Sequence, residues 1–217
     1  MLVWARTSAG LSQAEAAKRL NIALERLSEW ESGEDSPTLK QLTRLAAICK
    51  RPPAVFYLPA PPRHFMPLKD FRRLPGAVAR QQSPDLSYQI RRAQQLREAA
   101  LELYAEVKVK APRFAIQAVV DEQPEVVGQR VRELLRVELD DQAKWGGTYN
   151  AFNHWRSAVE QRGILVFQAS GIPLDEMRGF SIAEEVAPAI VVSTKDTPNG
   201  RTFTLLYAKS RRTLEGY

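Results

Sequence analysis

Few side chains in this 217-residue sequence are of the types that carry out catalysis. The only histidines are His64, in a proline-rich segment, and His154, in an expected helix, so neither is grouped with other metal ligands. The single cysteine, Cys49, is expected to be a buried structural thiol. Glu184 and Glu185 are adjacent and therefore point apart, which favours a solvated loop. The sequence contains no P-loop, no G-x-G-x-x-G and no G-x-S-x-G pattern. We therefore expect no metal and no catalytic nucleophile.

The composition is that of an ordinary globular protein, with 44% hydrophobic and 26% charged residues. With one cysteine the chain can form no internal disulfide, and it has no apolar run of ~20 residues and no signal-peptide core. We therefore expect a cytoplasmic protein. The net charge of +6 is concentrated in residues 63–113, which hold 11 Lys/Arg against 5 Asp/Glu. This basic segment either attracts nucleic-acid phosphates or forms a solvated helix face.

The stretch from Leu11 to Pro37 predicts two short helices joined by a tight turn. Ser12 and Glu15 have the spacing of a capping box, which begins the first helix. Asn21 tolerates the left-handed backbone that the turn needs, and Gly33 supplies the stop after the second helix. We expect Ser36-Pro37 to open a further helix with proline at its first position.

This stretch resembles the Cro/repressor-type (XRE) helix-turn-helix family. The likeness lies in GLSQ at 10–13, LSEWESGE at 27–34 and PTLKQLTRLA at 37–46. It implies that the helix from about Ala23 to Ser32 enters the DNA major groove. An all-helical bundle that binds protein and uses the same packing is the alternative.

The resemblance also implies which residues would contact DNA. The groove-facing positions are Ala23, Leu24, Glu25, Ser28 and Glu29. Gln13 matches the family glutamine that begins the second helix and contacts the phosphate backbone. Lys18, Arg26 and Lys40 could add positive charge near phosphates. Glutamate can accept from cytosine N4 and leucine can contact a thymine methyl, but the face lacks Arg, Asn and Gln, which make the strongest base contacts.

Downstream, hydrophobic periodicity predicts further helices and a small sheet. Helices are expected at 38–50, 85–107, 124–136 and 149–161, and strands at 164–167, 180–182 and 189–192. On the helix at 85–107, apolar residues from Leu86 to Val107 share one face. These elements define a mainly helical α+β protein. We divide it into a helix-turn-helix domain at 1–50, a proline-rich basic linker at 51–84, and a third part at 85–217.

The C-terminal part resembles the ImmA/IrrE-type zinc metallopeptidase family. The likeness lies in AFNHWRSAVEQRGILVFQ from Ala151, MRGFSI at 177–182, PAIVV at 188–192 and KDTPNGRTFTLL at 195–206. The DFRRLP segment at 70–75 is also similar. In that family the segment matching FTLL leads into a zinc-binding HExxH helix, whose two histidines hold the metal while the glutamate activates water.

Here the HExxH positions are occupied by Tyr207, Ala208, Lys209, Ser210 and Arg211. A cation at the second histidine position repels zinc, and alanine at the glutamate position cannot take a proton. We therefore expect no cofactor, no peptidase activity and an incompletely covered sheet. The C-terminal residues are expected to be the product of a shifted reading frame, an interrupted gene or a natural truncation, and these alternatives stay open. The start is expected to lie a few residues downstream of the natural one.

Together these patterns predict a sequence-specific DNA-binding transcriptional regulator whose peptidase-like half lacks the zinc site. Double-stranded DNA is the expected partner, with a homodimer and a protein that covers the C-terminal half as further expectations. One alternative is an incomplete chain of a zinc endopeptidase that cleaves a repressor. Another is an antitoxin-like module that binds protein.

Overall fold

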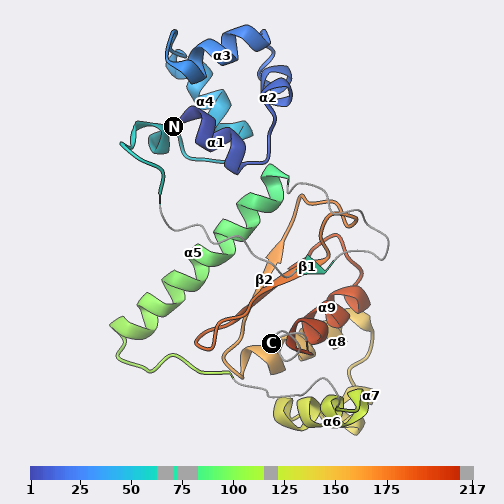
Figure 1. The fold of residues 1–217 in the computed structure, drawn as a ribbon. Coiled ribbons are helices and arrows are strands. Elements are labelled where there is room, and N and C mark those ends of the chain that lie inside the picture. The colour runs from blue at the N-terminus through green and yellow to red at the C-terminus, as the bar shows by residue number, and fades with distance from the viewer. Residues whose placement is uncertain (63–70, 73–82, 115–121, 211–217) are drawn as a thin grey trace. The chain divides into compact units, whose positions relative to one another are not determined.

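The computed structural model describes residues 1–62, 71–72, 83–114 and 122–210 (Figure 1). The chain forms two compact units. The first comprises Met1–Pro67 and Ala79–Arg91, and the second comprises Leu68–Val78 and Arg92–Tyr217. Of the DFRRLP segment at 70–75, only Phe71 and Arg72 are described. His64 lies outside the described residues.

The first unit begins with four short helices, α1 (Leu2–Ser8), α2 (Gln13–Leu20), α3 (Leu24–Ser32) and α4 (Leu39–Ile48). The predicted capping box starts α2, since Glu15 N donates to Ser12 Oγ at 3.2 Å and Ser12 N donates to Glu15 Oε2 at 2.9 Å. Asn21 has φ 58° and Gly33 has φ 87°, so the turn and the stop were predicted correctly.

The core of this unit lies where the four helices meet. Its buried residues include Leu20 on α2, Leu27 and Trp30 on α3, and Leu45 on α4. The predicted start of α4 was wrong: Thr38 is the N-cap and forms a second capping box with Gln41, so Pro37 lies before the helix. A threonine side chain satisfies backbone N–H groups that a proline at the first position would leave to solvent.

Two further segments belong to the first unit. The proline-rich stretch forms a short 3-10 helix, η1 (Pro53–Tyr57), whose Phe56 packs against the core while Tyr57 stays exposed. The long helix α5 (Pro84–Glu106) begins in this unit, as Lys50 Nζ lies 3.0 Å from Asp85 Oδ1 and Arg91 donates to the Lys50 carbonyl at 3.0 Å.

The second unit is built on a four-stranded sheet of order β1-β3-β4-β2. Its strands are β1 (Phe71–Arg72), β2 (Leu165–Ala169), β3 (Gly179–Ile182) and β4 (Ala189–Ser193). β2 runs parallel to β4, with Phe167 opposite Val191, whereas β3 is antiparallel to β4 and to β1. Every residue of β3 and β4 is buried, and these two predicted strands form the inner part of the sheet, whereas the third predicted strand, β2, lies at its edge.

Helices α6 (Pro124–Leu135), α7 (Leu139–Ala143), α8 (Thr148–Glu160) and α9 (Pro198–Ser210) complete this unit. Phe152 and Trp155 on α8 are buried and pack with Leu205 of α9 and with Val166 and Ile190 of the sheet. On α6, Leu135 is buried, whereas the neighbouring Leu134 is 38% exposed. The helix α7 and the strand β1 were not predicted.

The sheet was expected to be incompletely covered, but α9 covers β3 and β4 on the face where it packs. α9 packs directly on β3, and a Cβ added at Gly179 would collide with the Thr204 side chain. Thr204 and Leu205 are buried, so FTLL at 203–206 supplies cover and not only a lead into a missing element. The helix therefore protects β3 and β4 although its residues differ from those of a metal-binding helix.

Candidate nucleic-acid interface

The helix α3 presents one face to the core and the other to solvent. Leu27 and Trp30 point inward and are 0% and 3% exposed. The opposite face is exposed and carries the positions that were predicted to face the major groove: Ala23, Leu24, Glu25, Ser28 and Glu29. Ala23 is the N-cap and has no side chain that could accept from the first backbone N–H groups of α3. These donors are therefore left for water or a phosphate.

A buried ion pair fixes α3 against the first helix. Arg6 Nε lies 2.6 Å from Glu31 Oε1, and Arg6 Nη2 lies 2.9 Å from Glu31 Oε2, which makes the pair bidentate. Arg6 Nη1 also donates to the Leu11 carbonyl at 2.9 Å. The two side chains are only 12% and 6% exposed, so solvent screens the pair weakly.

Gln13 joins this network at the first residue of α2. Its Nε2 donates to Glu31 Oε2 at 2.8 Å, so the Glu31 carboxylate holds α1, α2 and the end of α3 together. Burial raises the pKa of the Glu31 carboxyl. The hydrogen bonds from Arg6 and Gln13 and the charge of Arg6 lower this pKa, and together they outweigh the effect of burial. The net pKa of Glu31 lies below its usual value, which means that folding favours its charged form.

The predicted phosphate-contacting residues lie around this frame. Lys18 on α2, Arg26 on α3 and Lys40 on α4 are all exposed. The guanidinium carbon of Arg26 lies 5.9 Å from the centre of the Trp30 ring, one turn further along α3, so this side chain lies against its own helix. Gln13 is half-buried, and one of its two amide N–H groups is used by Glu31. Its other N–H remains available to a ligand.

Comparison with known proteins gives one match, to the N-terminal unit. The helix-turn-helix family model matches residues 2–56. Residues 2–56 form a helix-turn-helix domain. The domain places the chain among candidate DNA-binding regulators, and α3 is the second helix of its motif. No curated protein and no solved structure matches the chain.

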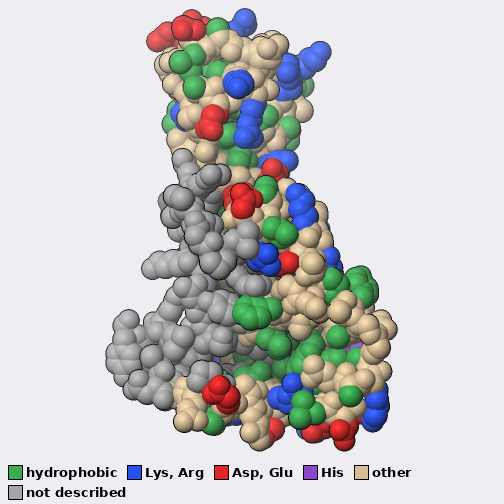
Figure 2. Space-filling model, turned by 90° about the vertical axis from the view of Figure 1, so that its right-hand side faces the viewer, with side chains coloured by type: hydrophobic (Ala, Val, Ile, Leu, Met, Phe, Trp, Pro, Cys, Tyr) green, Lys and Arg blue, Asp and Glu red, His purple; other side chains and the backbone are tan. Residues whose placement is uncertain are grey.

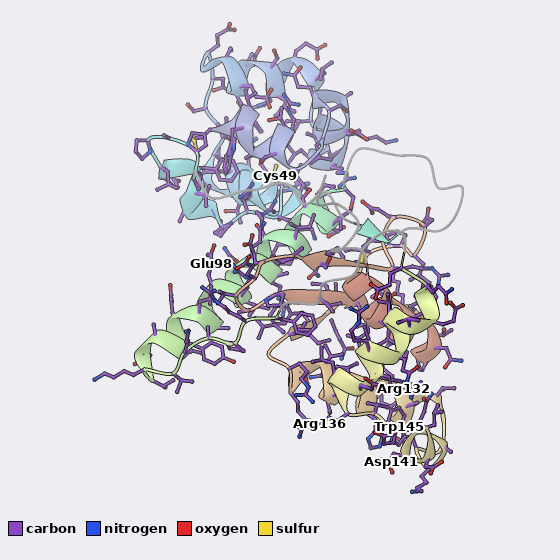
Figure 3. The ribbon with its side chains drawn as sticks, turned by 60° about the horizontal axis from the view of Figure 1, so that its bottom comes forward. Cys49, Glu98, Arg132, Arg136, Asp141 and Trp145 are labelled. Atoms are coloured by element: carbon purple, nitrogen blue, oxygen red, sulfur yellow. The ribbon has the colours of Figure 1, made fainter. Side chains whose placement is uncertain are left out.

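Of the two histidines weighed as metal ligands, His154 lies in the described part of the chain and His64 does not. Across the described residues, no group of three or more His, Cys, Asp or Glu side chains could hold a metal ion. His154 stacks on Trp145, with the ring centres 4.9 Å apart, and Trp145 meets the edge of Trp155. Arg132 lies over Trp155 at 5.4 Å, so these side chains tie α6 to α8 (Figure 3). We assign them a packing role.

The positions expected for HExxH fall at the end of α9. Residues 207–210 are helical, and Arg211 lies outside the described residues. No described helix is long and apolar enough to span a membrane.

Sequence reasoning missed the network of Arg6, Gln13 and Glu31 as a unit. It assigned Gln13 to phosphate and gave no role to Arg6 or Glu31. A signal was present: both charged residues interrupt apolar positions of short helices, where unpaired charges are costly. Opposite charges at two such positions favour a mutual pair, but sequence alone does not show that the two helices meet there.

Proposed function

We propose that this protein is a sequence-specific DNA-binding transcriptional regulator whose helix α3 lies in the major groove. The observation that carries the proposal is the match of residues 2–56 to the helix-turn-helix family, together with an α3 whose outer face is exposed. The ion pair between Arg6 and Glu31 supports the geometry, because it holds α3 rigidly while leaving that face open. Rigid presentation reduces the entropy lost on binding.

The chemistry of α3 favours particular bases. The carboxylates of Glu25 and Glu29 can accept from the N4 amino group of cytosine, which the major groove exposes. Leu24, which is 43% exposed, and Ala23 offer apolar contact to thymine methyl groups. We therefore propose a preference for half-sites that present cytosine and thymine to the first two turns of α3.

Binding energy would come from phosphates. Lys18 and Lys40 are exposed on α2 and α4, and Gln13 and the N-terminus of α3 offer neutral donors. Each lysine that neutralises a phosphate releases counterions, so affinity should fall with salt. These contacts set orientation without reading sequence.

The proposal is tested by fluorescence anisotropy of the full chain on duplexes selected from a random library, over a range of salt concentrations. Lys18→Ala and Lys40→Ala should each weaken binding to all sequences and reduce the salt slope by about 1. Glu25→Gln should alter the selected sequence instead. Lys144→Ala, at the exposed C-cap of α7, is the matched control and should change nothing. A folded chain that binds no duplex at low salt would refute the proposal.

A protein-binding module is the second candidate, because the outer face of α3 is acidic. Glu25 and Glu29 are exposed there, and Glu34 follows just beyond its end. Acidic and basic side chains both reach the surface of the N-terminal unit in the face drawn in Figure 2. Carboxylates repel phosphates and suit a basic partner. This candidate predicts that Glu25→Lys increases non-specific DNA binding, whereas the regulator predicts loss of sequence preference.

For the C-terminal half we propose a peptidase-like fold without zinc chemistry. The support is the residue types at the HExxH positions, where Tyr207 and Arg211 replace the histidines and Ala208 replaces the glutamate. We propose no cofactor and a cytoplasmic location. Metal analysis of the purified chain should give much less than one zinc per chain, and one tightly held zinc with chelator-sensitive proteolysis would overturn this proposal.

A further inference from the structure

The second half of α5 carries an exposed apolar stripe. We define the stripe as Leu96, Ala100, Leu103 and Val107, which follow one another at helical spacings of four, three and four. Val107 comes directly after the last helical residue. At 100° per residue, the four positions fall within about 60° of the helix circumference. Leu96, Leu103 and Val107 are 42%, 60% and 63% exposed, whereas Leu86 and Ile90 in the first half are fully buried.

Arg97, on a flank of this half of α5, bonds the helix to the second unit. Arg97 Nε donates to the Ala187 carbonyl at 2.9 Å, and Arg97 Nη2 donates to the Val186 carbonyl at 2.8 Å. Arg97 lies about 90° from the middle of the stripe, so these bonds hold α5 in place with the stripe turned away. Among the described elements, Figures 1 and 3 draw no helix or strand alongside this half of α5.

We propose that the stripe is a homodimer interface, formed with α5 of a second copy running antiparallel. The charges beside the stripe favour this occupant. Arg92 lies along the edge of the stripe near its N-terminal end, and Glu106 lies along the same edge near its C-terminal end; both are exposed. In an antiparallel pair, same-edge residues of the two copies meet, so each Arg92 faces a Glu106 of the other copy. A parallel pair would instead keep Arg92 and Glu106 about 21 Å apart along the axis, at 1.5 Å per residue, so they would not meet.

The same register matches the apolar residues. When Arg92 is opposite Glu106 of the second copy, the two-fold axis passes at Ala99, next to Ala100, and Leu96 and Leu103 of the two copies lie within one residue, about 1.5 Å along the axis, of facing each other. Small side chains at this crossing let the two helices approach closely, and the leucines fill the space on each side. The stripe is therefore complementary to itself, as a two-fold symmetric interface requires.

The size of the stripe sets the strength of the dimer. Three to four helical turns bury less than the roughly 800 Å² per partner of a standard interface, so we expect a dissociation constant on the order of micromolar. The proposal does not depend on DNA binding, and its test uses no DNA.

The test is sedimentation equilibrium of the full chain, with folding of each variant checked by circular dichroism. Leu103→Glu places a charge in the stripe and should weaken dimerisation at least about tenfold. The matched control is Leu139→Glu on α7, a leucine that is 68% exposed against 60% for Leu103 and lies outside the stripe. It should leave the dimer unchanged. A wild-type chain that stays monomeric at about 100 µM, or a dimer equally weakened by both substitutions, would overturn the proposal.

The direction of the helices is tested by charge exchange. Arg92→Glu and Glu106→Arg should each weaken the dimer severalfold, and the double variant should restore it, because each copy then offers the reversed pair. Failure of the double variant to recover would contradict the antiparallel register.

Cysteine crosslinking gives a second check of direction. Ala100→Cys lies near the proposed two-fold axis and should form a disulfide-linked dimer on mild oxidation. Val107→Cys should not, because the two copies of that position lie about 22 Å apart along the axis, at 1.5 Å per residue. The native Cys49 is fully buried and gives no background. Crosslinking at Val107→Cys but not at Ala100→Cys would overturn the proposal.

Discussion

Replacement of Glu31 by glutamine should destabilise the N-terminal unit far more than an ordinary surface change. The substitution keeps the shape of the side chain but removes its charge, so Arg6, only 12% exposed, loses its bidentate carboxylate partner. Removal of one partner of a buried pair costs about 3–5 kcal/mol, and we expect about 3 kcal/mol here because Arg6 keeps its bond to the Leu11 carbonyl. Such a loss is a large part of the total stability of a small domain.

Hydrogen exchange of the full chain, read peptide by peptide, separates the two units. A loss of about 3 kcal/mol should speed exchange of the most protected amides in α2, α3 and α4 by about two orders of magnitude, while peptides from β4 and α8 keep their rates. The matched control is Glu25→Gln, which makes the same chemical change on the exposed face of the same helix. It should alter stability by less than about 0.5 kcal/mol.

A double substitution distinguishes a charge effect from a packing effect. Arg6→Met with Glu31→Leu removes both charges and keeps apolar volume, so it should recover most of the stability lost by Glu31→Gln. The reasoning would be refuted if the α2, α3 and α4 amides exchanged at the same rates in the Glu31→Gln and Glu25→Gln variants. The pair of Arg6 and Glu31 would then contribute nothing to holding α3.

Three further predictions follow from the described contacts. Because the pKa of Glu31 is lowered in the folded state, the charged carboxylate stabilises the fold above the unfolded pKa, and this stabilisation is lost as the pH falls through the folded pKa. Acid unfolding, followed by hydrogen exchange of α3 amides, should therefore depend less steeply on pH for Glu31→Gln than for wild type. Burial raises the pKa of Cys49 to about 11 although Arg51 and Arg6 favour the thiolate, so a thiol reagent at pH 8 should label it only on unfolding, and rapid labelling of the folded chain would contradict this. Gly200→Ala should destabilise the second unit by about 1–3 kcal/mol, because the new Cβ collides with the buried Asp196 carboxylate, whereas Gly128→Ala on open α6 should stabilise it slightly; thermal melts giving both variants the same sign would count against the argument.

The local elements were predictable because their signals are local. The capping box at Ser12 and Glu15, the left-handed turn at Asn21 and the stop at Gly33 depend on backbone preferences of a few residues. The outward positions of α3 came from the family resemblance, and the burial of Leu27 and Trp30 agrees with them. The exact beginning of α4 was not predictable, because Pro37 and Thr38 each have a preference for helix N-termini and only one could take that place.

The parts that were missed depend on distant residues. The pairing of Arg6 with Glu31 spans 25 positions and requires that α1 and α3 meet. The cover that α9 gives to β3 depends on Gly179 being opposite Thr204, which no local pattern reveals. DNA contacts at Gln13, Lys18 and Lys40 remain predictions, since exposure makes a contact feasible without demonstrating it.

The helix α5 shows how a correct periodicity can conceal two environments. Its apolar positions from Leu86 to Val107 share one predicted face, and the helix forms at almost the expected bounds. Leu86 and Ile90 are buried within the chain, whereas Leu103 and Val107 remain exposed. Periodicity reports only that a face avoids water, and a face can do this against its own chain or against another molecule. The buried half of α5 ends near Arg92, and the exposed half carries the acidic residues Glu98, Glu102 and Glu106. Within one chain, Arg92 and Glu106 lie too far apart along α5 to meet. In the proposed dimer each Arg92 meets a Glu106, because the second α5 runs in the opposite direction.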